Sequence, residues 1–250
     1  SQNKKIELLA PAGNFEKLEI AVHYGADAVY LGGRDFSLRN FSGNFSIIEM
    51  ARAIAFAHEK NVRVYVAVNI YPRTQEERAI ADFLAQVGET GADAVIIADP
   101  GVLAQARKII PRIPVHLSPQ ANTTSRRSLR FWADLGVSRV NPARELTLAE
   151  IQTLAADSPV EIETFVHGAM CISYSGRCLL SSFLAHRDAN RGQCAHPCRW
   201  RYAVVEELRP GQFMPLMEDD RGSYIFNSRD LCMIDHLPEI RVEIGKSQDI

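Results

Sequence analysis

The sequence lacks the features of a membrane or exported protein. No apolar run approaches the roughly 18 to 20 residues that cross a bilayer. The first residues, Ser1 to Lys5, are polar and carry neither an apolar stretch nor a small-residue cleavage site, so nothing directs export. We therefore expect a cytoplasmic protein that has no membrane partner.

Charge of one sign is not in excess either. The formal net charge is -2, which excludes a global electrostatic field for a polyanionic partner, so any RNA binding must use a local patch. Charged residues make up 23% and hydrophobic residues 46%, which excludes a disordered chain. A length of 250 residues suits one large domain.

A glycine-rich phosphate loop is also missing. The segment after the first predicted strand, Ala10-Pro11-Ala12-Gly13-Asn14, is too poor in glycine for a dinucleotide loop. Short apolar runs nevertheless alternate with amphipathic stretches. We predict strands at Ile6 to Ala10, Ala28 to Leu31, Val62 to Ile70, Ala94 to Ala98, Val115 to Leu117, Ser138 to Asn141 and Glu161 to Val166. We predict helices at Phe15 to Tyr24, Ile47 to Glu59, Gln75 to Glu89, Val102 to Ile109, Ser128 to Leu135 and Leu148 to Ala155.

This alternation predicts an α/β fold with a parallel, TIM-barrel-like (β/α) repeat. The phrase Gly-Ala-Asp-Ala-Val occurs at residues 25–29 and again at 91–95, as expected of a repeated helix-to-strand turn. In a barrel, the chemistry lies on the loops that follow the strands. The polar residues predicted at those ends are Asn69, Asp99, Gln120, Asn122, Arg144 and His167.

The periodicity stops after Gly168. We divide the chain into barrel-like repeats over residues 1–168 and, over residues 169–250, a cysteine-rich insertion with C-terminal elements of the same domain. The insertion is predicted to continue through Arg201 to Leu208, a loop at Pro210 to Gly222, a strand at Tyr224 to Asn227 and a helix at Asp230 to Leu237. Arg241 to Ile244 is the only candidate for an eighth strand, so the barrel is predicted to be incompletely closed.

Cysteine is scarce except in this insertion. Four of the five cysteines, Cys171, Cys178, Cys194 and Cys198, fall within 28 residues, and Cys232 follows. Thiolates are the ligands that iron-sulfur clusters and zinc select, and a cubane cluster takes four of them. His167, His186 and His196 flank the thiols and keep a mixed Cys/His zinc site as an alternative. Two other interpretations remain: buried small hydrophobes, or one nucleophilic cysteine paired with a histidine.

Several segments resemble a family of collagenase-like peptidases of unassigned mechanism, family U32, which also contains bacterial tRNA uridine 5-hydroxylation proteins. They are Glu7-Leu-Leu-Ala-Pro-Ala-Gly13, Glu163-Thr-Phe-Val-His-Gly-Ala-Met-Cys171, Ser175-Gly-Arg-Cys178-Leu-Leu-Ser181, Arg187-Asp-Ala-Asn-Arg-Gly192, Cys194-Ala-His-Pro-Cys198-Arg-Trp200 and Asn227-Ser-Arg-Asp-Leu-Cys232. The resemblance is greatest to the tRNA-modifying branch. It implies oxygen-independent, prephenate-dependent hydroxylation of the wobble uridine at carbon 5, with tRNA and a small acidic co-substrate as partners.

The resemblance also implies a cysteine-bound four-iron four-sulfur cluster. Cys171, Cys178 and Cys232 match family positions, and Cys198 is preferred as the fourth ligand, with Cys194 as the alternative. The tail, Arg241 to Ile250, lacks the Lys-Ile-Glu-Gly-Arg-Met-Lys type motif that usually follows in the family. A second family member, or a C-terminal segment missing from this chain, is therefore expected to complete the barrel.

Other residues have both a functional and a structural interpretation. His167 and Arg144 are the candidates for a catalytic role. The structural alternatives are a hydrogen-bonded histidine and a helix-start ion pair between Arg144 and Glu145. Asn69, Gln120 and Asn122 are candidates to bind substrate, or they satisfy loop backbone. The candidates for RNA contact are Arg177, Arg187, Arg191, Arg199, Trp200 and Arg201, against the alternative of a solvated surface.

A collagenase-like peptidase is the second functional hypothesis, and a structural zinc-binding protein is the third. We find no Ser-His-Asp order, no His-Glu-x-x-His motif and no carboxylate pair that spacing brings together, so proteolysis has little support from the sequence.

Overall fold

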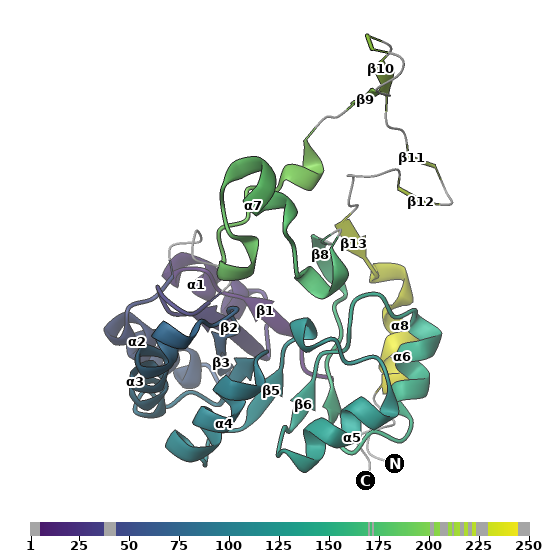
Figure 1. Cartoon of the computed structure of the whole chain (residues 1–250). Helices are drawn as coiled ribbons and strands as arrows, with labels where there is room; N and C mark the ends of the chain where they lie inside the picture. The colour runs from purple at the N-terminus through teal and green to yellow at the C-terminus, as the bar shows by residue number, and fades with distance from the viewer. Residues whose placement is uncertain are drawn as a thin grey trace.

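The computed structural model consists of a curled parallel sheet, helices around it and a cysteine-rich segment at one end (Figure 1). It describes residues 6–37, 44–169, 171, 173–200, 203–205, 210–211, 213–215, 218–219, 222–223 and 230–244. In this part of the chain no helix is both long and apolar enough to cross a membrane.

Seven parallel strands form the main sheet in the order of the sequence. They are β1 (Leu9–Pro11), β2 (Ala28–Gly32), β3 (Arg63–Val68), β4 (Ala94–Ile97), β5 (Val115–Leu117), β6 (Arg139–Val140) and β7 (Glu161–Ile162). Each overlaps a strand predicted from the sequence, and the TIM-barrel-like repeat is confirmed. The sheet curls into a half-barrel whose two edges are β1 and β7, and no strand of the described residues joins these edges.

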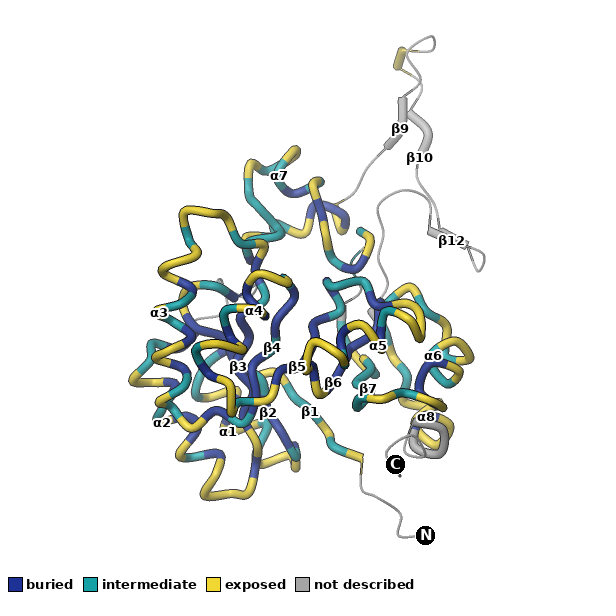
Figure 2. Tube along the Cα trace, turned by 60° about the horizontal axis from the view of Figure 1, so that its bottom comes forward, coloured by how far each residue is buried: buried dark blue, intermediate teal, exposed yellow. Residues whose placement is uncertain are grey.

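Six helices cover the outer face of the sheet, and the predicted helices are confirmed. They are α1 (Phe15–His23), α2 (Ile47–Glu59), α3 (Glu77–Gly88), α4 (Pro100–Ile109), α5 (Arg126–Asp134) and α6 (Leu148–Ala155). Ser46 and Thr147 begin α2 and α6 with capping boxes that satisfy free backbone N–H groups. The apolar core lies between sheet and helices, where Figure 2 shows buried strands behind helices whose outer faces are exposed.

The two Gly-Ala-Asp-Ala-Val repeats have the same local structure. In each, the glycine adopts the left-handed conformation that ends a helix, with φ of +88° and +84°. The aspartate that follows accepts a hydrogen bond from the main chain of the preceding strand segment. Asp27 Oδ2 accepts from the N–H of Leu8 (3.0 Å), and Asp93 Oδ2 accepts from the N–H of Val64 (2.7 Å). The repeat therefore ties each new strand to its neighbour.

The chain after β7 forms shorter elements. They are β8 (His167–Ala169), α7 (Leu180–Ala185), β9 (Ala203–Val205), β10 (Phe213–Pro215), β11 (Glu218–Asp219), β12 (Gly222–Ser223), β13 (Asp230–Cys232) and α8 (Leu237–Ile244). β8 pairs with β13 in antiparallel fashion, so the insertion leaves and rejoins the barrel at one place. We call residues 171 and 173–200 the cap.

Two predictions about the end of the chain were wrong. Asp230–Cys232 is a strand rather than the start of a helix, because it pairs with β8. Arg241 to Ile244 belongs to helix α8 rather than to an eighth strand. Ile240 of this helix is buried and α8 packs against α6, so packing on a helix rather than pairing with the sheet places this segment. The predicted strand at Tyr224 to Asn227 lies outside the described residues.

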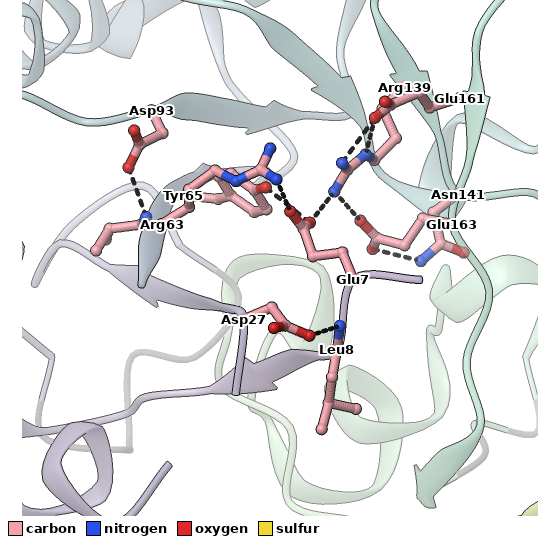
Figure 3. Close-up of polar contacts among 11 residues, drawn as sticks. Glu7, Leu8, Asp27, Arg63, Tyr65, Asp93, Arg139, Asn141, Glu161 and Glu163 are labelled. Atoms are coloured by element: carbon pink, nitrogen blue, oxygen red, sulfur yellow. Dashed lines mark hydrogen bonds and ion pairs between the residues drawn. The ribbon is translucent and has the colours of Figure 1, made fainter. Parts of the chain in front are cut away.

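The interior of the half-barrel is polar, whereas the interior of a closed barrel is usually filled with branched apolar side chains. Glu7, which precedes β1, lies at the centre of this network (Figure 3). Its Oε1 accepts hydrogen bonds from Tyr65 (2.7 Å) and Arg139 (2.6 Å), and its Oε2 pairs with Arg63 (3.0 Å). Burial and the hydrogen bond to Glu7 raise the pKa of Tyr65.

The network continues onto β7. Arg139 also donates two hydrogen bonds to Glu161 Oε2, and its Nη1 lies 3.7 Å from Glu163. Burial raises the pKa of Glu163, whose Oε1 accepts from Asn141 (3.0 Å). His116 is the cross-strand neighbour of Arg139 on β5. Burial, with the positive charges of nearby arginines, lowers the pKa of His116 to about 3, so this imidazole is neutral.

Candidate functional site

The cap is attached to the loop that follows β3. The guanidinium of Arg191 forms two hydrogen bonds with the carboxylate of Glu76, one of them 2.7 Å between Nη1 and Oε2. The N–H of Tyr71 donates to the carbonyl of Asn190 (3.0 Å). The pair with Arg191 holds the pKa of Glu76 below its ordinary value. Arg191 thus fastens the cap, a role that the sequence did not reveal.

A second attachment joins the cap to the loops that follow β5 and β6. Glu145 accepts hydrogen bonds from both the N–H and the hydroxyl of Ser175, the latter at 2.9 Å. Burial works to raise the pKa of Glu145, but the hydrogen bonds from Ser175 outweigh it and lower this pKa. Arg177 Nε donates to the carbonyl of Gln120 (3.1 Å). Glu145 therefore contacts the cap, and the positive charge of Arg144 adds to the lowering of its pKa.

The two attachments place the cap across the C-terminal ends of the strands. The loops after β3, β5 and β6 all lie at this end of a parallel sheet, where (β/α) barrels carry their active sites. Figure 1 shows α7 and its neighbouring turns beside this end of the barrel, with β8 and β13 at its base. The cysteine-rich segment is therefore positioned by ion pairs and hydrogen bonds from several barrel loops.

Cys194 lies within electrostatic range of the three other thiols of the cap. Burial raises the pKa of Cys194, and the negative charges of Cys171, Cys198 and Cys178 raise it further. Cys178 and Cys198 are buried, whereas the other two are half-buried. The N–H of Leu180 donates to Cys178 Sγ and that of His196 donates to Cys194 Sγ, both at 3.3 Å. Such N–H···S bonds stabilise thiolates.

Cys232 stands apart from these four in its environment. It is exposed on β13, directly opposite His167 on β8, which is also exposed. Cys171 follows β8 by two residues, so this ladder brings Cys232 to the base of the cap. Among the described residues, no histidine side chain is hydrogen-bonded to a serine or a cysteine.

The described donor side chains form no compact metal site. Within the described ranges, no three His, Cys, Asp or Glu side chains meet closely enough to hold one metal ion. A tetrahedral zinc site requires four donors about 2.3 Å from one centre. A cubane cluster binds each thiolate through a different iron, so its ligands stand further apart. The iron-sulfur cluster and the zinc site both stay predictions from the sequence.

The predicted strand-end residues have different environments. Asp99 caps α4 by accepting hydrogen bonds from the N–H groups of Gly101 and Val102, which is a structural role. Gln120 is buried and accepts from the hydroxyl of Ser118, and Asn69 is half-buried after β3. Asn122 has a left-handed backbone with φ of +57°, and its buried Oδ1 has no hydrogen-bond partner among the described residues.

The cap exposes aromatic and basic side chains together. Trp200 is 48% exposed, and both Arg177 and Arg199 are exposed, whereas Arg187 is half-buried. Phe183 of α7, which is 79% exposed, was not among the residues predicted from the sequence. The one available signal in the sequence was the pair Phe183-Leu184, which lies in a short segment between polar residues. Arg201, the remaining candidate for RNA contact, lies outside the described residues.

The fold and this site define a (β/α)-barrel protein with a thiol-rich cap over its C-terminal mouth. The sequence profile of Peptidase family U32 matches residues 13–246, and the chain belongs to this family. The solved structure of the U32 peptidase Mk0906 has the same fold, with a TM-score of 0.56 and 15% identity over 67% of this chain and 71% of that chain.

Two curated relatives are similar over almost the whole chain. The tRNA hydroxylation protein P1 of Bacillus subtilis (strain 168) is 40% identical over 242 residues, which cover 97% of this chain and 57% of the relative. The tRNA hydroxylation protein P of Helicobacter pylori (strain J99) is 43% identical over 240 residues, which cover 94% of this chain and 57% of the relative. The chain therefore spans just over half the length of these relatives.

Proposed function

We propose that this chain is part of an enzyme that hydroxylates a tRNA base. The reaction is 5-hydroxylation of the wobble uridine, oxygen-independent and dependent on prephenate as co-substrate. The observation that carries the proposal is the thiol-rich cap, which Arg191 and Glu145 fasten over the mouth of a (β/α) barrel. The names of the relatives support the substrate class.

The proposed cofactor is a four-iron four-sulfur cluster held by four of the five thiolates. From the sequence, the preferred ligands are Cys171, Cys178, Cys198 and Cys232. The electrostatic contacts of Cys194 with three other thiols support its inclusion, with Cys198 and Cys232 then competing for the last position. When bound, such a cluster supplies one-electron chemistry that side chains lack.

The chain's own residues position the reactants. The partly buried hydrogen bonds between the cap and the loops after β5 and β6 fix the position of the cap. Single-stranded bases stack on exposed aromatic side chains and on arginine. Trp200 and Phe183, with Arg177 and Arg199 nearby in the sequence, offer such a surface beside the thiols. We propose that the anticodon loop binds there.

Anaerobic purification tests the cofactor. The first expected result is a brown protein with broad absorption near 400 nm and about four irons per chain. A colourless protein with one zinc would contradict the cluster and support the structural zinc site. The chain covers 57% of the length of the Bacillus subtilis relative. The matched control is therefore the same measurement on the protein expressed from the whole gene.

Analysis of tRNA tests the reaction. Deletion of the gene is expected to remove 5-hydroxyuridine derivatives from the wobble position, and a plasmid copy restores them. A plasmid copy with Cys171→Ser serves as the inactive control. Unchanged wobble uridine in the deletion strain would contradict the proposal. Gelatin cleavage that survives removal of all five cysteines would instead support the collagenase-like peptidase.

A further inference from the structure

One side of the barrel is strongly positive although the chain as a whole is not. Residues 100–137, which include α4, β5 and α5, contain six basic side chains and one acidic side chain, a net charge of +5. The formal net charge of the whole chain is -2, so the remaining residues together carry -7. The charges are therefore segregated, and an anionic partner is attracted to this side of the molecule.

Five of the six basic side chains are exposed and unpaired. We call these five the basic face: Arg107, Lys108, Arg112, Arg127 and Arg130. Among the described residues, none of the five side chains forms an ion pair or a hydrogen bond. The sixth, Arg126, pairs with Asp157 (3.1 Å) and donates to the carbonyl of Thr153 (2.9 Å). The basic face thus offers five cations to a partner outside the chain.

The basic face is continuous across two helices. α4 and α5 follow one another around the outside of the sheet (Figure 1), and the guanidinium of Arg107 lies against Gly136, two residues after α5 ends. Arg127 and Arg130 are about one turn apart on α5, whose inner side is buried through Trp132. With nine residues at 1.5 Å each, α5 is roughly 13 Å long, and the three guanidinium groups follow its length.

The positive charge is unfavourable for α5 itself. The first turns of α1, α2, α3 and α6 each contain a glutamate, which suits the positive end of the helix dipole. The first turn of α5 contains Arg126 and Arg127 instead. Both repel Arg130, because residues three and four apart lie on the same side of a helix. A merely solvated helix gains nothing from this arrangement, whereas a bound polyanion turns the repulsion into attraction.

The basic face begins beside the cap. In a (β/α) unit, the helix starts at the C-terminal end of its strand and runs back along the outside. Arg127 in the first turn of α5 therefore lies nearest the mouth, and Arg107 in the last turn of α4 lies far from it. The loop that leads into α5 is also attached to the cap, because its Gln120 carbonyl accepts from Arg177 (3.1 Å). A rod-shaped polyanion that extends from the cap along α5 meets the basic face.

The composition of the basic face favours nucleic acid over an acidic protein. Four of its five cations are arginine, whose planar guanidinium forms two parallel hydrogen bonds with a phosphate. Protein interfaces have an apolar centre that is depleted of charge. On α4 and α5, the one large apolar side chain that is exposed is Phe131. The face therefore lacks the apolar centre that a protein partner requires.

We propose that the basic face binds the sugar-phosphate backbone of double-stranded RNA, as the stem of the tRNA arm whose loop binds at the cap. The position of the loop rests on the proposed function, whereas binding of a stem to α4 and α5 does not require hydroxylation. Arg127 and Arg130 bind phosphates near the mouth, and Arg107 binds phosphates further along the stem. Because backbone contacts carry no sequence information, this face orients the RNA and leaves the recognition of bases to the cap.

Filter binding at several salt concentrations tests the basic face. The probe is an RNA hairpin with the sequence of an anticodon arm. Each phosphate contact contributes about 0.7–0.9 to the slope of log K against log salt. Arg127→Gln combined with Arg130→Gln is therefore expected to reduce the slope by about 1.5 and to weaken binding about tenfold at about 0.1 M salt. An unchanged slope and affinity in this double variant would overturn the proposal.

Arg52→Gln combined with Arg78→Gln is the matched control. These two arginines are exposed on the outer helices α2 and α3, and their side chains form no ion pair or hydrogen bond with the described residues. The control removes the same charge, and we expect a slope and an affinity close to those of wild type. Equal losses in both double variants would show that total charge rather than α5 determines binding, and would contradict the proposal. Circular dichroism checks that both variants fold.

Two further measurements separate a stem contact from other contacts. Arg127→Lys combined with Arg130→Lys keeps both charges, so the slope should stay close to that of wild type. The single-stranded loop sequence alone should bind the α5 glutamine double variant as tightly as it binds wild type, because this RNA has no stem. An equal loss of affinity for the hairpin and for the loop sequence would contradict the assignment of the basic face to the stem.

The proposed function and the basic face can be contradicted separately. Unchanged wobble uridine in the deletion strain, together with weakened hairpin binding in the α5 glutamine double variant, would contradict hydroxylation and support the basic face. Confirmed hydroxylation, together with normal hairpin binding in that variant, would contradict the basic face as an RNA contact. An acidic protein would then be the partner class that its charge fits.

Discussion

Glu7 and Arg139 are 132 residues apart in the sequence and are joined by an ion pair of 2.6 Å inside the half-barrel. Glu7 precedes the first strand of the sheet and Arg139 begins the sixth, so the pair links the open side of the sheet (Figure 3). Arg139 is 9% exposed, which means that its charge depends on carboxylates in the interior.

Glu7→Gln is expected to destabilise the protein by about 2 kcal/mol, because Arg139 loses a charge-assisted hydrogen bond while it keeps its pair with Glu161. Urea unfolding measures the loss. The matched control is Asp157→Asn, which breaks the exposed pair with Arg126 and should stay within about 0.5 kcal/mol of wild type. Similar decreases in the free energy of unfolding in the two variants would show that the burial of Arg139 does not strengthen its contribution to stability.

His116 should make stability depend on pH. Its pKa is about 3 in the folded protein against 6.5 in the unfolded chain, so the unfolded chain binds more protons between these values. Stability from this group is complete above pH 6.5 and falls with pH, by about 2 kcal/mol at pH 5. His116→Phe should reduce the difference in unfolding free energy between pH 7.5 and pH 5 by that amount. An unchanged difference would mean that His116 is not held neutral.

Arg191→Lys should loosen the cap but not the barrel. Lysine keeps the charge but cannot form the two parallel hydrogen bonds to Glu76. Hydrogen exchange is expected to accelerate at residues 188–191 and in α7, with the strands β2 to β5 unaffected. Arg130→Lys on the outer helix α5 is the control. Uniform acceleration across the sheet would contradict a local role.

Cys194→Ser should remove most of the iron and the absorption near 400 nm from anaerobically prepared protein. The reason is that Cys194 shares its environment with Cys171, Cys178 and Cys198, and a serine hydroxyl is a poor ligand for iron. Iron content and the spectrum of Cys198→Ser and Cys232→Ser, measured in parallel, identify the remaining ligand. An unchanged iron content in Cys194→Ser would mean that Cys194 is not a ligand, and would support the four ligands preferred from the sequence.

Phe183→Ser and Trp200→Ala should each weaken tRNA binding about tenfold, because one stacked base contributes about 1–3 kcal/mol. Filter binding at fixed salt measures the change. Tyr24→Ser is the control, since Tyr24 is equally exposed but lies at the end of α1, away from the cap. Equal loss in Tyr24→Ser would show that aromatic exposure in general, rather than the cap, determines binding.

Local signals were sufficient to predict the barrel. Alternating strands and helices, glycine at helix ends and the repeated Gly-Ala-Asp-Ala-Val phrase act within a few residues, and all seven strands and six helices were predicted correctly. The end of the chain was less predictable, because Asp230–Cys232 becomes a strand only by pairing with β8, some 60 residues earlier in the chain. A pairing at that separation leaves no local pattern.

The candidate site shows the same division. Clustered cysteines were visible as a motif, and the strand ends that carry Gln120, Asn122 and Arg144 followed from the predicted repeat. The partners of these residues were not visible. Glu145 accepts hydrogen bonds from Ser175, and Arg191 pairs with Glu76, because folding brings the cap back onto loops about 30 and 115 residues earlier.

The inward-facing row of His116, Arg139 and Glu161 also sets how the last strands can align. A shift of one residue turns every side chain of a strand to the opposite face. A shifted β6 would push the guanidinium of Arg139 among aliphatic helix side chains with no carboxylate near it, at a cost of several kcal/mol. An interior of apolar side chains alone would tolerate such a shift more readily. The buried charges of the half-barrel therefore also select the correct register of its last strands.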